Sequence, residues 1–166
     1  MDATELQAAQ SPLKDRYRED AASAVVTLRA EGRLGDEEVS CSVQTGRALV
    51  EAGLHPASGG DGSLACSGDM LLQALVACAG VTLRSVATNR SMEVSGTISA
   101  EGDLDFRGTM GVSREAPVGF RAIRLRFDIE SSASPEDLDA ALTATERYCV
   151  VYQTLINGTP VEVLRP

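Results

Sequence analysis

The fold is decided by the stretch Ser67-Gly-Asp-Met-Leu-Leu-Gln-Ala-Leu-Val-Ala-Cys-Ala-Gly-Val-Thr-Leu-Arg-Ser-Val-Ala-Thr-Asn89. Ser67 can cap a helix and Asp69 places a negative charge in its first turn, so a helix is expected to begin here. No charged side chain occurs from Met70 to Leu83, and this apolar segment is shorter than the roughly 20 residues that cross a bilayer. The stretch therefore predicts the buried central helix of a soluble domain, with Cys78 in its middle.

Length and composition favour one domain with a polar extension. The chain has 166 residues, of which 43% are hydrophobic, and this is enough for a single core. We expect residues 1–22 to form an N-terminal arm or helix, interrupted by Pro12, and residues 23–166 to form the domain. The net charge of −9 and the scattered arginines argue against nucleic acid or an anionic membrane as a partner.

The N-terminus and the cysteines indicate a cytoplasmic protein with free thiols. The chain starts without the basic residues and apolar run of a secretory signal, so a reducing compartment is expected. The cysteines at 41, 66, 78 and 149 form no Cys-x-x-Cys pair, and the single histidine, His55, is expected on a surface loop. Neither a metal nor an organic cofactor is predicted.

Alternating apolar residues predict an antiparallel sheet that packs against the central helix. A hairpin is expected from residues 25–30 and 39–43, and the clearest strand is Phe120 to Glu130, with one packed face and one wet face. Further strands are expected at 92–100, 107–114 and 161–164, with a turn at 103–105, whereas residues 46–53 fit either a strand or a short helix. Ser134 and Pro135 predict the start of another helix. The fold class is therefore α+β.

The apolar setting of Cys78 leaves two interpretations open. Burial makes a thiol less acidic, and the helix dipole helps only in the first turn, so a reactive Cys78 requires a cation beside it. The alternative is a small apolar core residue, as free cysteines often are. Cys66, next to the expected helix start, is a secondary thiol candidate, and Cys41 is interpreted as an apolar residue on the inner face of the sheet.

Four features in order carry a family resemblance: the segment from Asp69 to Cys78, the strand at Gly119-Phe120, the helix at Pro135-Glu136 and the second cysteine, Cys149. With them, residues 24–164 resemble the OsmC/Ohr family. This resemblance implies an α+β fold in which two protomers intertwine as a homodimer. It also implies thiol-dependent reduction of an organic hydroperoxide, with Cys78 attacking the peroxide, Cys149 resolving the oxidised product as a disulfide, and an external dithiol restoring both thiols.

The resemblance also assigns a role to an arginine and points to three departures. In the hydroperoxide-resistance branch a hairpin arginine pairs with the thiolate, and Arg33 is the candidate here; the alternative is a solvated turn arginine. The glutamate that would hold this arginine is replaced by Gly68, with Asp69 beside it, and the proline that usually follows the second cysteine is Val150. These departures indicate a divergent branch. The alternative function is a non-enzymatic dimer that binds a small apolar ligand or senses redox state.

Overall fold

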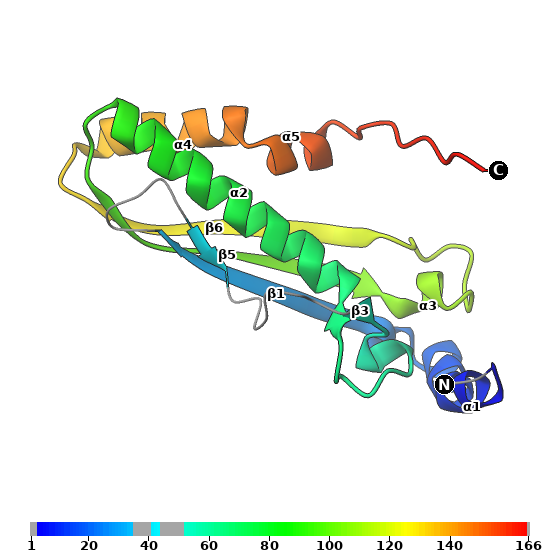
Figure 1. Cartoon of the computed structure of the whole chain (residues 1–166). Coiled ribbons are helices and arrows are strands. Elements are labelled where there is room, and N and C mark those ends of the chain that lie inside the picture. The colour runs from blue at the N-terminus through cyan, green and yellow to red at the C-terminus, as the bar shows by residue number, and fades with distance from the viewer. Residues whose placement is uncertain (1–2, 35–40, 44–51, 166) are drawn as a thin grey trace.

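A four-stranded antiparallel sheet supports the fold of this chain, whose computed structural model describes residues 3–34, 41–43 and 52–165 (Figure 1). The sheet has the order β2-β1-β5-β6. Its strands are β1 (Val25–Leu34), β2 (Cys41–Val43), β5 (Val94–Asp105) and β6 (Phe120–Ser131). The β1–β2 pair confirms the predicted hairpin, with Leu34 opposite Cys41, while the turn between the two strands lies outside the described residues.

Strand β6 has the two-sided character that its sequence predicts. Its side chains alternate between half-buried and exposed along the strand. The half-buried side chains that pack on the main core are Ile123, Leu125, Phe127 and Ile129. On the exposed face, Arg124 pairs with Asp103 of β5 at 2.6 Å. One face of the sheet therefore needs a cover, and the other faces solvent.

Helix α2 (Ser67–Asn89) provides that cover and confirms the predicted central helix. It contacts strands β1, β2 and β5 of the sheet and two further helices. Leu72, Leu75, Val76, Ala79 and Leu83 are fully or almost fully buried on it. With 23 residues the helix is long and apolar enough to cross a membrane by length and composition, but a buried core helix passes the same test, and α2 is packed as one.

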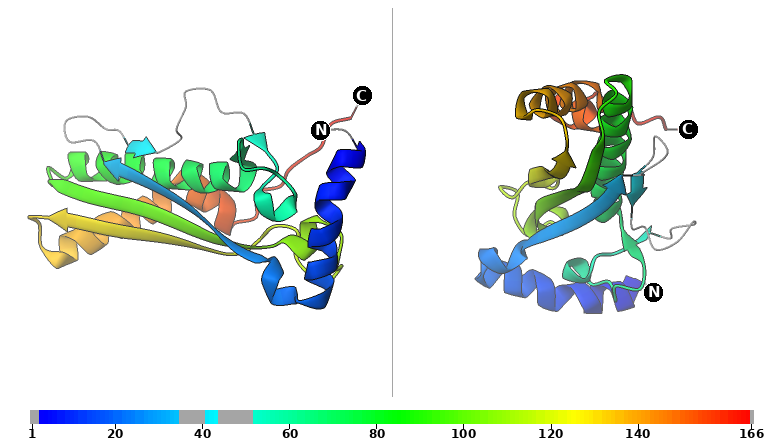
Figure 2. Two further views of the ribbon diagram at one scale, coloured as in Figure 1. Left: turned by 90° about the horizontal axis from the view of Figure 1, so that it is seen from below. Right: turned by 90° about the vertical axis from the view of Figure 1, so that its left-hand side faces the viewer.

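Two shorter helices lie beside α2, on the same side of the sheet (Figure 2). Helix α4 (Pro135–Tyr148) begins as predicted, because the Ser134 side chain accepts the backbone N–H of Asp137 at 3.1 Å. Helix α5 (Val150–Ile156) follows after a single residue, Cys149, which ends α4 and begins α5. The two helices contact α2 and cover part of the surface that the sheet leaves open.

The N-terminal segment packs at the end of the sheet where β1 begins and β5 ends (Figures 1 and 2). The elements there are α1 (Ala3–Glu19), η1 (Ala21–Ala24), β3 (Ala52–Gly53), η2 (Pro56–Ser58), β4 (Ala65–Cys66) and α3 (Phe106–Thr109). Tyr17 of α1 is buried with Phe106, and its hydroxyl donates to the carbonyl of Ala57 at 2.5 Å. Helix α1 runs through Pro12, so the predicted interruption was wrong. Contacts of Leu13 and Tyr17 in its second half hold the helix against the rest of the protein.

Three local predictions were wrong, one because of a local helix cap and two because strand pairing depends on distant residues. The expected turn at 103–105 is the end of β5, because these residues pair with residues 25–27 of β1. The expected strand at 107–114 begins instead as α3, whose first turn is capped when the Asp105 side chain accepts the N–H of Arg107. The expected strand at 161–164 is irregular and exposed, with Val161 at 86% exposure, because no strand lies beside it within the described chain.

The segment 46–53 is only partly described. Ala52 and Gly53 form β3, which pairs in parallel with β4. Residues 44–51 lie outside the described residues, so the choice between strand and helix stays open for them.

Candidate functional site

Cys78 lies midway along α2, on a face that is only partly covered. The thiol is half-buried, whereas Leu71 and Val81 near it are 37% and 41% exposed. The sequence predicted a helix buried all round, and the sheet side of α2 fits this prediction. The side that carries Cys78 remains accessible, so a small molecule can approach the sulfur.

The junction of α4 and α5 holds Cys149 against this site. Its backbone N–H donates to Thr145 of α4 at 2.8 Å, and its carbonyl accepts the N–H of Gln153 of α5 at 2.9 Å. The residue is 1% exposed, and its thiol lies within hydrogen-bonding reach of the Cys78 sulfur. The structure thus brings together two cysteines that are far apart in the sequence.

Hydrogen bonds make Cys78 the more acidic thiol of the pair. Burial, the largest single influence, raises the pKa of Cys78, but the hydrogen bonds to its sulfur outweigh burial and the net pKa is lowered. The groups that donate these bonds are the backbone N–H of Val151, the thiol of Cys149, the backbone N–H of Val150 and the hydroxyl of Thr82. The first turn of α5 therefore supplies two of the four donors.

Thr82 reaches the sulfur from one turn further along α2. Its hydroxyl donates to the backbone carbonyl of Cys78 at 2.7 Å. The same hydroxyl lies within hydrogen-bonding reach of the Cys78 sulfur. A hydroxyl has a single proton to donate. Thr82 therefore donates to the carbonyl when Cys78 is a thiol, and it can donate to the sulfur when Cys78 is a thiolate.

The pKa of Cys149 shifts in the opposite direction. Burial and the neighbouring Cys78 raise it to about 11, although the backbone N–H groups of Tyr152 and Val151 act against the rise. Cys78 therefore loses its proton first, and Cys149 remains a thiol that donates to it. This division suits an attacking thiolate and a resolving thiol.

No described guanidinium contributes to the pKa of Cys78. Arg16 and Arg18 belong to α1, where Arg16 lies over the Tyr17 ring and Arg18 pairs with Asp15 at 2.6 Å. Arg33 lies in β1, opposite Ser42 of β2, and not in the turn where the sequence placed it. The side chains of Arg33 and Arg29, and all of Arg47, fall outside the described part.

Cys66 and the start of α2 form a different environment. Cys66 is the residue before the helix and its side chain makes no capping hydrogen bond, so Ser67 is not the cap that the sequence predicted. Asp69 lies in the first turn, as expected, where burial raises its pKa and the charge of His55 acts against that rise. Cys41 lies in β2, but its side chain is outside the described part.

A groove of about 500 Å³ adjoins the pair of cysteines between α2 and α4. Thr82, which contacts Cys78, and Tyr148, which precedes Cys149, both line it. The other lining residues are Val81, Ser85, Val86, Asn89, Arg90 and Ala144. Its partly apolar lining can hold an organic molecule beside the residues that flank Cys78 and Cys149.

Sequence reasoning identified both cysteines but missed most of what surrounds them. Thr82 was visible as a residue one helical turn from Cys78, so spacing alone could have identified it. The backbone N–H groups of Val150 and Val151 leave no trace in residue type. These two amides can donate to Cys78 only because a new helix, α5, begins after Cys149 and its first turn faces α2.

Comparisons with known proteins agree on one family. A family model described as OsmC-like protein matches residues 60–164. A crystal structure of an OsmC-like hydroperoxide resistance protein from Jannaschia sp. CCS1 superimposes with a TM-score of 0.51 at 15% sequence identity, covering 84% of this chain and 91% of the other. This similarity bears out the α+β fold. A search of curated protein sequences finds no match.

Proposed function

The chain belongs to the OsmC-like family, and we propose that it is a thiol-dependent peroxidase that reduces organic hydroperoxides through Cys78 and Cys149. The observation that carries this proposal is the contact between the two thiols, in which Cys78 has a lowered pKa and Cys149 a raised one. A thiolate is the nucleophilic form of cysteine, so the pair is divided into an attacking and a resolving partner before substrate arrives.

The chemistry proceeds in three balanced steps. The Cys78 thiolate attacks the terminal oxygen of the hydroperoxide, the O–O bond breaks, and the alkoxide that leaves takes up a proton as an alcohol. Cys78 is now a sulfenic acid. The Cys149 thiol condenses with it, which forms the S–S bond and releases water. An external dithiol then reduces the disulfide, returning two electrons and two protons to the pair.

Specific groups in the structure support the first two steps. The backbone N–H groups of Val150 and Val151 stabilise the negative sulfur before the attack. Burial raises the pKa of Cys149, so this residue stays a thiol until it reacts with the sulfenic acid of Cys78. The groove between α2 and α4 favours an organic hydroperoxide over hydrogen peroxide. Burial of the substrate's apolar surface against the apolar side chains of the groove stabilises the complex, and hydrogen peroxide has no such surface.

The active form in this proposal is a homodimer in the cytoplasm. Partly exposed apolar residues on the Cys78 face of α2, and the exposed Val150 and Ile156 of α5, provide a surface for a second copy. Arg33, from the hairpin of either copy, is the proposed cation for the thiolate. A reducing compartment would supply the dithiol that the last step requires.

Steady-state turnover of cumene hydroperoxide with excess dithiol tests the proposal. We expect Cys78→Ser to abolish turnover, because an alcohol at this position is not a nucleophile at neutral pH. Cys149→Ser should consume about one equivalent of peroxide and then slow, since its sulfenic acid has no internal partner. Cys66→Ser is the matched control and should keep the wild-type rate. Unchanged turnover in Cys78→Ser would refute the proposal.

A second candidate is a non-enzymatic dimer that binds a small apolar ligand in the same groove or responds slowly to oxidants. It is favoured by the lack of a described guanidinium at Cys78. It predicts negligible turnover by the wild type, together with an apolar ligand that raises the melting temperature by binding the folded state.

A further inference from the structure

A second pocket, separate from the pair of cysteines, lies where the N-terminal segment meets the sheet. Its volume is about 620 Å³, within the range of about 300–1,000 Å³ typical of small-molecule sites. Its wall is mainly apolar and includes Leu54, Leu71, Leu104, Phe106, Met110 and Phe120. Cys66 also lines it; this residue is twelve positions before Cys78, or about 18 Å along the axis of α2, so the two sites are distinct.

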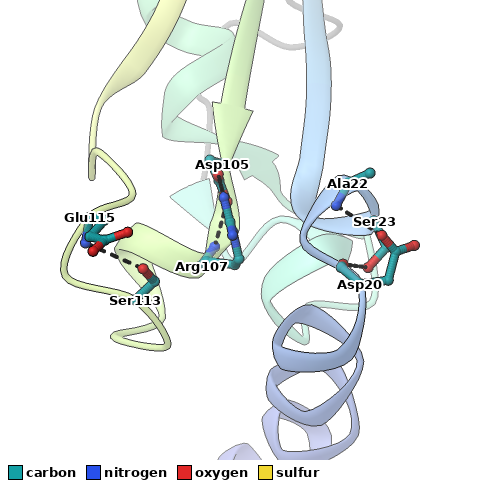
Figure 3. A network of polar contacts seen from close by, with 7 residues as sticks. All are labelled: Asp20, Ala22, Ser23, Asp105, Arg107, Ser113 and Glu115. Atoms are coloured by element: carbon teal, nitrogen blue, oxygen red, sulfur yellow. Dashed lines mark hydrogen bonds and ion pairs between the residues drawn. The ribbon is translucent and has the colours of Figure 1, made fainter.

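The charges that line this pocket leave one cation in excess. Lys14 and Asp105 are the two lining residues of the Lys, Arg, Asp and Glu types. Asp105 is bound by Arg107, whose Nε donates to Oδ1 at 3.0 Å and whose Nη2 donates to Oδ2 at 2.6 Å (Figure 3). These hydrogen bonds lower the pKa of Asp105, so its negative charge is retained and already balanced. Lys14, by contrast, makes no ion pair with any side chain in the described part of the chain.

His55, which also lines the pocket, adds no negative charge. Its Nδ1 accepts the backbone N–H of Ala57 at 3.0 Å, and its ring stacks on Phe106 with centroids 5.0 Å apart. The imidazole is thus held as part of the wall by an acceptor bond on one side and an aromatic ring on the other. Among the lining residues, Lys14 is the only lysine or arginine, and no described side chain forms an ion pair with it.

From this arrangement we propose that the pocket binds a small amphipathic monocarboxylate, with its carboxylate at Lys14 and its apolar body against the Leu104, Phe106 and Phe120 wall. An apolar wall with one unbalanced ammonium group selects a molecule with one negative end and one apolar end. A polyanion would lack further cations, and a neutral lipid would leave Lys14 without an acceptor.

This site is a feature of the N-terminal part of the chain and does not depend on the peroxidase proposal. Lys14, Leu54 and His55 precede residue 60, where the family match begins. Lys14 lies on α1, which the buried Tyr17 anchors to the rest of the protein. The helix α1 therefore positions the charged group of a site that the matched region alone does not complete.

Binding of octanoate to the full chain, measured by calorimetry under reducing conditions, tests the proposal, with octanol as its neutral counterpart. We expect octanoate to bind several-fold more tightly than octanol. Lys14→Met keeps the aliphatic part of the side chain and should lower the affinity for octanoate about threefold to fivefold, while the affinity for octanol stays unchanged. Arg18→Met is the matched control, because it removes the same charge from the same helix at an exposed position that does not line the pocket.

A second variant and a protection assay locate the ligand. Gly119 lines the pocket, and a Cβ at this position would meet no heavy atom within 4 Å. The Gly119→Leu variant should therefore fold normally and bind both octanoate and octanol more weakly. Bound octanoate should also slow alkylation of Cys66 by iodoacetamide and leave Cys78 unaffected.

Three results would overturn the assignment. The first is equal affinity of the wild type for octanoate and octanol. The second is protection of Cys78 and not Cys66, which would place octanoate in the groove beside the pair of thiols. The third is a change of oligomeric state in Gly119→Leu with octanoate affinity retained, which would mean that a second copy of the chain covers the pocket.

Discussion

At the level of single residues, the account depends on how a half-buried sulfur in an apolar helix becomes acidic. Desolvation alone would raise the pKa of Cys78, and four hydrogen bonds reverse the direction. Hydrogen bonds to a charged group are worth about 1.5–3 kcal/mol each, so a few of them suffice against partial burial. A guanidinium would add to this stabilisation, but the lowered pKa does not require one.

Thr82 offers the sharpest test at this scale. Replacing it by valine keeps the shape and removes a donor to the thiolate, so the pKa of Cys78 should rise. Because only the thiolate is alkylated, the rate with iodoacetamide climbs as pH passes the thiol pKa, and the whole profile should move to higher pH. At pH 7 we expect the rate to fall about fivefold to tenfold.

Thr88→Val is the control for this variant. Thr88 makes the same type of bond, from its hydroxyl to the carbonyl of Arg84 at 2.8 Å, but it is exposed and far from either thiol. Its replacement should leave the alkylation profile of Cys78 unchanged. Equal pH profiles of alkylation for the wild type and Thr82→Val would show that the hydroxyl does not donate a hydrogen bond to the Cys78 thiolate.

At the level of elements, the break between α4 and α5 creates the site. Cys149 has an extended backbone, with φ −71° and ψ 108°, which lets α5 start afresh and direct the N–H groups of Val150 and Val151 at Cys78. A continuous helix would use these N–H groups for its own hydrogen bonds. The interruption of one helix therefore supplies two donors to a residue on another.

Val150→Pro probes this break directly. Proline suits the first position of a helix, and the extended backbone of Cys149 suits the residue before a proline, so α5 should persist. The variant loses the Val150 N–H, and Cys78 should alkylate several-fold more slowly at pH 7. Val150→Ala, which keeps the N–H, should match the wild type. If both variants behave alike, this amide does not stabilise the thiolate.

Element prediction succeeded where local pattern and tertiary pairing agree. The α2 stretch, the first hairpin, β6 and the Ser134-capped α4 follow from periodicity and capping, because each of these segments packs in the way its own side chains favour. The end of β5 and the 161–164 segment were mispredicted, since the first is set by pairing with β1 and the second lacks a partner strand. The proximity of Cys78 and Cys149 followed only from family resemblance, because no local pattern encodes contact between such distant residues.

At the level of the whole molecule, the Cys78 face of α2 is the surface that a second copy would cover. Val81 is 41% exposed there, three residues from the reactive thiol. We expect sedimentation equilibrium to give twice the chain mass of 17.4 kDa for the wild type. Val81→Asp should shift the equilibrium to monomer by placing a charge in an apolar contact. Asn89→Asp adds the same charge at the end of the same helix and should remain dimeric; a monomeric wild type would contradict the proposed assembly.

The most direct measurement is a single turnover. Fully reduced protein is mixed with one equivalent of cumene hydroperoxide, quenched with an alkylating agent, and mapped by mass spectrometry without reduction. The account predicts one equivalent of the alcohol, one disulfide that joins Cys78 to Cys149, and free Cys66. Unconsumed peroxide with all thiols alkylated, or oxidation confined to another cysteine, would contradict it.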